Sequence, residues 1–229
     1  MPSRQPLRDY LDVSRTRVQR LAAALPDKVA RRLTAASLQL GKIGGGVTLG
    51  PDARDEFIRM IADVEHAVRA DYTVRSINDR ELTVGHWVES RRILMAYGVP
   101  QWSSDPVGAA LFTSIEMQNR VLLVGSSSQL LDRMHPAAED PGGMMSNPQS
   151  IEGLLQIARS DTPGAGTASA SDAWARHGYP IANLHRVMSE SSPPQPVQFL
   201  AVVIQTSQDD QGWSNIIAHP LYVAAAAPD

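Results

Sequence analysis

Apolar residues recur at helical spacing over the opening of the chain. Steps of three and four residues connect one set of positions: Leu7, Leu11, Ser14, Val18, Leu21 and Leu25. This spacing lines one face of an α-helix, and Pro26 ends it because the residue before a proline is pushed out of the helical region. The same steps then connect Val29, Leu33, Ala36 and Leu40, and Gly41 suits a helix end. The pattern predicts a helical arm over residues 1–42.

Three glycines at residues 44–46 predict a joint between this arm and the rest of the chain. Beyond the joint, Asp52 suits the cap of a third helix whose apolar spacing continues to Val68. The next stretch has two interpretations. Either residues 72–84 form a short hairpin, or Thr83 caps a fourth helix that passes through Met95 and ends near Gly98.

The centre of the chain combines helical and strand patterns. Asp105 and Pro106 open a predicted helix with apolar spacing as far as Ile115. The run Val-Leu-Leu-Val at residues 121–124 is typical of a strand buried on both faces. Apolar residues at positions 151, 154, 155 and 158 then predict a short helix, and residues 162–171 have the composition of a low-complexity loop.

The end of the chain carries the clearest strand pattern. Residues 197–206 are mostly apolar, residues 207–212 are polar, and residues 213–223 are again mostly apolar, which predicts a hairpin. Such an apolar strand needs cover from another sheet or another subunit. The predicted fold class is α+β, or α/β, with a helical N-terminal third, a mixed centre and a β-rich end. The predicted domains are the arm over residues 1–42 and one body over residues 43–229.

Charge divides the chain in the same place. The arm holds nine basic and three acidic residues, whereas residues 43–229 hold 12 basic and 21 acidic residues. The net charge of the whole chain is −3. A basic arm on an acidic body predicts a contact with nucleic acid or with an acidic protein surface. The arginines expected to make this contact are Arg15, Arg17, Arg20, Arg31 and Arg32.

Composition narrows the classes of protein. The chain of 229 residues has 43% hydrophobic and 20% charged residues, as in soluble globular proteins. No apolar run approaches the roughly 18–20 residues of a membrane span, and the charged N-terminus lacks the apolar core of a secretory signal. There is no cysteine, which excludes disulfides, thiolate nucleophiles and cysteine-ligated metals. These features predict a cytoplasmic protein, or one within an assembled particle.

The strongest candidate for a ligand site is a loop after the apolar run at residues 121–124. Its residues are Gly125, Ser126, Ser127 and Ser128. A strand followed by a Gly/Ser loop and a helix start presents backbone N–H groups to an anion, although any strand can turn into a helix in this way. The nucleophile-elbow pattern Gly-x-Ser-x-Gly is not met, because position 129 is glutamine. The glycines at residues 44–46 also fail the phosphate-loop pattern, since no Gly-Lys-Ser/Thr follows.

Histidine spacing gives no metal site. His86 and Glu89 are one helical turn apart, but a carboxylate-bridged site needs a second such pair, and Glu65 with His66 does not supply it. His177 and His185 match no zinc-ligand spacing. The sequence therefore predicts neither a metal nor a cofactor, and it contains no catalytic motif.

Two functions from different classes fit these features. The leading hypothesis is a non-enzymatic, self-assembling structural protein of coat, shell or scaffold type, a capsid-like homo-oligomer. Its basic arm would contact a neighbouring subunit or nucleic acid. The alternative is a small α/β enzyme or ligand-binding module that uses the Gly125 loop for an anionic small molecule. The sequence favours the structural protein, because this hypothesis explains both the basic charge of the arm and the apolar C-terminal strand.

Overall fold

The computed structural model describes residues 10–14, 17–18, 20–21, 51–99, 109–126, 148–160 and 177–227. The chain forms two compact units. One unit combines residues 1–13 with residues 75–229, and the other spans residues 14–74.

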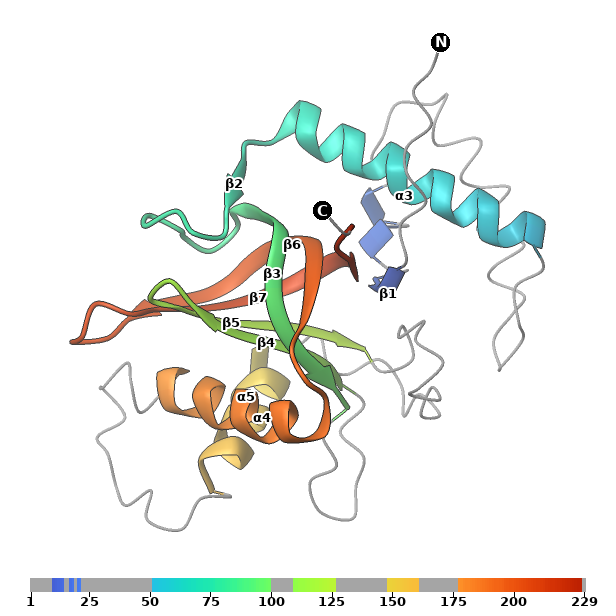
Figure 1. The fold of residues 1–229 in the computed structure, drawn as a ribbon. Coiled ribbons are helices and arrows are strands. Elements are labelled where there is room, and N and C mark those ends of the chain that lie inside the picture. Colours follow the sequence, from blue (N-terminus) through green and yellow to red (C-terminus); the bar gives the residue numbers. More distant parts are fainter. Residues whose placement is uncertain are drawn as a thin grey trace. The chain divides into compact units, whose positions relative to one another are not determined.

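The larger unit is built on a closed β-barrel of five strands (Figure 1). The strands are β3 (Trp87–Gly98), β4 (Ala109–Glu116), β5 (Asn119–Ser126), β6 (Gln195–Gln208) and β7 (Ser214–Ala225). Around the ring their order is β3, β4, β5, β7 and β6, after which β6 pairs again with β3. All of these pairs are antiparallel except β5 with β7. Closure gives each strand of the ring a paired neighbour on both sides over part of its length.

Strand β3 closes the ring because it changes partner along its length. Its first part pairs with β6, and its last three residues pair with β4. A shift of register between Ser90 and Ile93 marks an irregularity in the pairing with β6. Bulges of this kind bend a strand and increase its twist, which a small barrel requires.

Two short strands lie outside the ring. Strand β1 (Tyr10–Val13) pairs with the end of β7, at Tyr222, Val223 and Ala224. Strand β2 (Val74–Ser76) lies next to β3.

Two hairpins build most of the barrel. A two-residue turn, Met117 and Gln118, joins β4 to β5, and both residues have positive φ (50° and 63°). A longer loop joins β6 to β7, where Gln208 pairs with Ser214. Asp209 organises this loop, because its Oδ1 accepts hydrogen bonds from the amides of Gln211 (3.0 Å) and Trp213 (2.9 Å).

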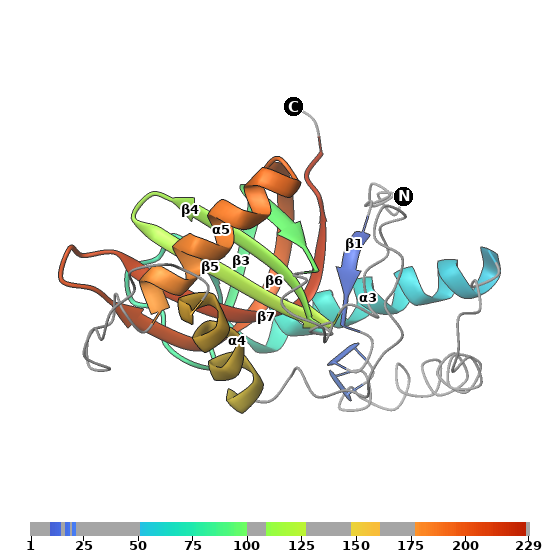
Figure 2. The same cartoon turned by 90° about the horizontal axis from the view of Figure 1, so that it is seen from below.

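Helices α4 (Pro148–Ser160) and α5 (Tyr179–Ser191) form a second layer (Figure 2). Helix α5 packs on β3, β4 and β5, and α4 packs on α5. Strands β4 and β5 therefore face the barrel interior on one side and a helix on the other. This explains why the run at residues 121–124 is buried throughout and carries no alternation of polar residues.

The smaller unit contains α3 (Pro51–Asp71), the longest helix described. Its buried side chains, Met60, Ile61, Val64 and Val68, recur at helical spacing. Glu65 is also buried, and Arg69 one turn later donates a hydrogen bond of 3.0 Å to its carboxylate.

The predicted fold class is wrong, because the fold is mostly β rather than α+β or α/β. The helical N-terminal third is not seen, and residues 10–13 of the expected first helix form strand β1. The second expected helix, over residues 27–40, lies outside the described residues. The expected helix over residues 105–115 is also wrong, because residues 109–116 form β4. Of the two interpretations of the stretch after residue 72, the helix that begins at Thr83 is wrong, because β3 begins at Trp87. The hairpin over residues 72–84 is not formed either, because only Val74–Ser76 of that stretch form a strand.

Tertiary context explains these errors. In β4 both faces are covered, so apolar residues follow one another closely enough to imitate helical spacing. Strand β3 is buried near its two ends but exposes Arg91, Arg92 and Leu94, and its apolar residues are too unevenly spaced to show the alternation of a strand. The predictions confirmed by the structure are the buried strand at residues 121–124, the C-terminal hairpin, and the helices now seen as α3 and α4. The loop predicted at residues 162–171 lies outside the described part of the chain.

Candidate functional site

A buried ion pair lies where the start of β5 meets the loop between β6 and β7. The guanidinium Nη1 of Arg120 donates a hydrogen bond of 2.6 Å to Oδ2 of Asp209. Only 5% of Arg120 and 7% of Asp209 are exposed to solvent. Burial by itself raises the pKa of Asp209, but the hydrogen bond from Arg120, the amides of Trp213 and Gln211, and the charge of Arg120 lower it below its usual value. Asp209 therefore stays ionised and partnered.

Two further contacts fix the Arg120 side chain. Its guanidinium carbon lies 4.5 Å from the centre of the Trp213 ring, a cation–π arrangement. Its Nη1 also donates a hydrogen bond of 3.1 Å to Oδ1 of Asn215. Arg120 and Asn215 face each other in the parallel pairing of β5 with β7, so the sheet register brings these two side chains together.

The ion pair sets the direction of a longer chain of hydrogen bonds. A guanidinium can only donate, so the oxygen of the Asn215 amide faces Arg120 and the nitrogen faces away. That nitrogen donates to Oγ of Ser207 at 3.3 Å. The Ser207 hydroxyl also lies 2.8 Å from Nδ1 of His177, a hydrogen bond whose donor depends on the histidine tautomer. The imidazole of His177 is the last group of this chain of hydrogen bonds.

We name these five residues the Arg120 network: Arg120, Asp209, Asn215, Ser207 and His177. Chemically, the arrangement holds a serine hydroxyl within hydrogen-bond distance of an imidazole, which are the first two parts of a nucleophile and base pair. It also leaves each linking hydrogen bond with a donor and an acceptor, which is what a structural network in a protein interior requires.

A second buried charge lies on β1. Asp12 is fully buried, and neither carboxylate oxygen has a hydrogen-bond partner among the described residues. Burial raises the pKa of Asp12 to about 7, against a smaller opposing effect of the Val13 backbone. The carboxyl occupies the space that a side chain at Gly125 would need, since a Cβ atom built there lies 2.6 Å from Asp12 Oδ2.

This contact bears on the predicted anion loop. Gly125 and Ser126 are the last residues of β5, and Ser127 and Ser128 lie outside the described residues. The glycine serves the close approach of the Asp12 carboxyl. A carboxylate at that place repels an anion once it is ionised, so the described geometry gives the loop no support as an anion site. The loop stays a prediction.

The basic arm is described at only two of its five predicted contact residues. Arg17 is half-buried, and its pKa falls to about 10, mainly through burial and further through the charge of Arg20. Arg20 is exposed. Arg15, Arg31 and Arg32 lie outside the described residues. Two guanidinium groups in one helical turn therefore repel each other, as their spacing in the sequence predicts.

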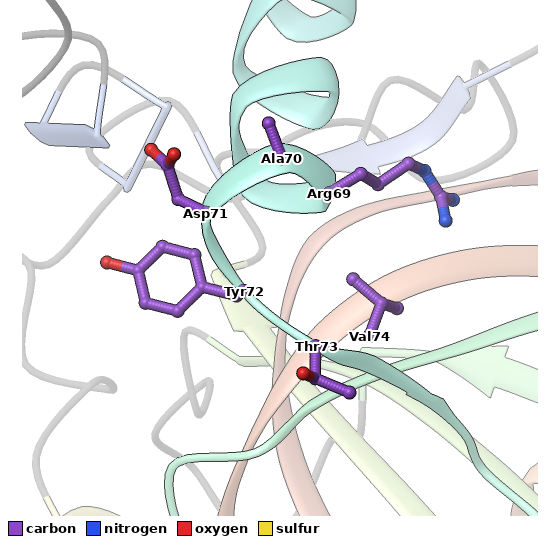
Figure 3. A pocket seen from close by; sticks show the side chains of 6 residues that line it. All are labelled: Arg69, Ala70, Asp71, Tyr72, Thr73 and Val74. Carbon is purple, nitrogen blue, oxygen red and sulfur yellow. The ribbon is translucent and has the colours of Figure 1, made fainter.

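An open depression of about 500 Å³ lies at the C-terminal end of α3 (Figure 3). Six consecutive residues line it: Arg69, Ala70, Asp71, Tyr72, Thr73 and Val74. In Figure 3 the side chains of Asp71 and Tyr72 point to one side of the backbone and that of Arg69 to the other. A surface built from one continuous turn brings no distant groups together, so this depression is a weaker candidate site than the Arg120 network.

The histidines that the structure describes do not converge on one site. His86 donates to or accepts from Thr83 in the turn before β3, and Glu89 lies within that strand, so the two share no helix face. His185 contacts Thr113 at 3.3 Å, and His219 donates from Nδ1 to the Val124 carbonyl at 2.8 Å. In the described part of the chain, no three His, Asp or Glu side chains are placed to hold a metal ion. No described helix is long and apolar enough to cross a membrane.

The sequence pattern did not single out Arg120, Asp12 or Asp209 as site residues. Arg120 directly precedes the apolar run at residues 121–124, and Asp209 lies within the polar residues 207–212 that follow the apolar run at residues 197–206. A charge in this position usually lies on the surface, and only the pairing of β5 with β7 shows that it is buried. For Asp12 the alternation of Leu11, Asp12 and Val13 carries a strand signal that the longer helical spacing concealed.

These features define a class: a small closed-barrel protein with a two-helix cover, a buried ion pair and an N-terminal strand added outside the ring. The chain belongs to the family of unknown function DUF7019, whose match extends over residues 8–227. No curated protein and no solved structure matches the chain.

Proposed function

We propose that the protein is a non-enzymatic structural subunit that assembles with copies of itself, and that residues 1–42 contact a neighbouring subunit or nucleic acid. The observation that supports this most directly is β1. An N-terminal segment that adds a strand to the end of β7 uses backbone hydrogen bonds, and these are available to any copy of the same segment. The proposal places the protein in the cytoplasm or within an assembled particle.

Charge supports the same proposal. The arm has nine basic and three acidic residues, and the rest of the chain has 12 basic and 21 acidic residues. Arg17 and Arg20 raise the local positive potential, which an acidic surface or a phosphate backbone would relieve. In a homo-oligomer the acidic body of one copy supplies such a surface to the arm of another.

The test compares two triple variants that remove the same charge. Arg15, Arg17 and Arg20 are changed to Gln in the first, and the exposed arginines Arg80, Arg91 and Arg186 of the larger unit are changed to Gln in the second. We expect the arm variant to lose mass by light scattering and to carry less nucleic acid by its A260/A280 ratio. We expect the body variant to match the wild type.

Two outcomes contradict the proposal. A wild-type chain that is monomeric at micromolar concentration excludes self-assembly. An arm variant with the same mass and the same A260/A280 ratio as the body variant shows that the arm is only a solvated surface.

A further inference from the structure

The end of β7 offers a binding slot that is separate from the barrel ring. Strand β7 pairs with β5 from Ser214 to Ala218, and with β1 from Tyr222 to Ala224. We call the β7 edge at residues 222–224 the β1 slot. Because the ring of five strands closes without β1, removal of β1 from this slot breaks no pairing within the ring.

The fit of β1 in the slot depends on the sequence of β1. Leu11 and Val13 are buried, at 9% and 1% exposure. The Tyr10 ring meets the Tyr222 ring edge to face, with 5.6 Å between centroids. The Asp12 carboxyl fits against β5 only because position 125 is glycine. Side chains therefore add specificity to the backbone pairing, and the strand that meets these requirements is β1 itself.

Strand β1 is buried, but few interactions hold it in the slot. It has four residues, and its register with β7 shifts between Tyr10 and Asp12. The buried carboxyl of Asp12 receives no hydrogen bond from the described residues, which costs free energy whenever β1 is docked. The division between the two compact units falls directly after Val13, so β1 is joined along the chain to the other unit and not to the barrel strands.

We propose that the β1 slot also takes the β1 strand of a second copy of this chain, so that two chains exchange N-terminal strands. The inference rests on the proposed self-assembly, and it identifies β1 and the β1 slot as the contact between subunits. Exchange replaces each intrachain strand with an identical one, so the slot gains no new type of contact and each barrel stays closed. The cost is then mainly that of association, which a high protein concentration offsets.

The absence of cysteine in the chain makes a direct test available. Tyr10 and Ala224 are paired across β1 and β7. The single variants Tyr10→Cys and Ala224→Cys are mixed, incubated at high concentration and oxidised. We expect a covalent heterodimer on a non-reducing gel, with a disulfide between the two substituted positions identified by mass spectrometry. We also expect the double variant to close an internal disulfide in dilute solution, which shows that the two positions face each other.

The control uses a pair within the ring. Gln198 and Ala224 are partners in the β6–β7 hairpin, where exchange would require the barrel to open. A mixture of Gln198→Cys and Ala224→Cys should therefore give only the background of random collision. The inference is overturned if the Tyr10 mixture gives no more heterodimer than this control while the double variant closes internally.

Light scattering on the same unoxidised samples separates this inference from the proposed function. An oligomeric mass without the heterodimer excludes strand exchange and leaves self-assembly in place. A monomeric mass without the heterodimer excludes both.

Discussion

Asp12 is a buried acid whose surroundings favour its protonated form. It has no hydrogen-bond partner among the described residues, and burial raises its pKa to about 7 from an ordinary value of 3.8. Folding therefore takes up a proton between these two pH values. The stability contributed by the protonated form is complete below about pH 4 and is lost as the pH rises through 7.

We predict that replacement of Asp12 changes how the unfolding free energy depends on pH. The wild type should lose up to about 4 kcal/mol of unfolding free energy between pH 4 and pH 8, since each pKa unit is worth about 1.4 kcal/mol. Asp12→Asn should remove most of this loss, because asparagine does not ionise. Urea unfolding across the pH range measures it. The exposed Asp210→Asn serves as control, and equal slopes for the two variants would count against a titrating Asp12.

The Arg120–Asp209 pair gives a second prediction at the residue scale. Arg120→Met leaves Asp209 buried without its partner and should cost about 3–5 kcal/mol of unfolding free energy. The matched change Arg186→Met breaks the ion pair between Arg186 and Glu190, whose two side chains are 62% and 64% exposed, respectively. It should cost less than about 0.5 kcal/mol. Equal melting temperatures for the two variants would show that the buried pair contributes little.

At the scale of elements, the β4–β5 hairpin uses a turn that its sequence suits poorly. Met117 and Gln118 both adopt positive φ, as in a type I′ turn, which favours Asn-Gly. The turn persists because eight consecutive pairs join β4 to β5 and because the amide of Ser214 in β7 donates to the Gln118 carbonyl at 2.9 Å. The hydrogen bonds of β5 with β4 and with β7 outweigh the conformational cost of positive φ at Met117 and Gln118.

Replacement of both turn residues should stabilise the barrel. Met117→Asn with Gln118→Gly should raise the unfolding free energy by about 1 kcal/mol, since glycine adopts positive φ without steric cost. Thermal unfolding provides the measurement. Thr206→Gly, placed in a paired part of β6, should instead lower stability by a similar amount. A double turn variant that is less stable than the wild type would mean that the exposed Met117 side chain, at 78% exposure, makes a contact that matters.

At the scale of the whole molecule, the closed ring of five strands does not depend on β1 for its strand pairing. The five strands and the helices α4 and α5 enclose one continuous apolar core. Strand β1 adds to this unit from outside the ring, and the Arg120 network joins the start of β5 to the loop between β6 and β7. Undocking β1 therefore breaks no strand pairing within the ring. This is why strand exchange and the proposed assembly through the arm are compatible with a stable subunit.

The sequence by itself determined those elements that have one exposed face or a clear turn. The spacing of Ile61, Val64 and Val68 predicted α3, and the polar residues at 207–212 between two apolar runs predicted the β6–β7 hairpin. The run at residues 121–124 predicted a buried strand. In each of these elements, the spacing of apolar residues along the chain matches the faces that the fold buries.

Tertiary structure decided the rest. Strand β4 is covered on both faces, so its closely spaced apolar residues resembled a helix, and β3 is buried near its two ends without a regular alternation. Helical spacing across residues 7–25 concealed β1, because four residues hold a strand only when β7 supplies their hydrogen bonds. The burial of Arg120 and Asp209 required a parallel pairing between segments about 95 residues apart in the chain. Long-range pairing sets strand partners and the environment of charges, and neither is encoded in a local window.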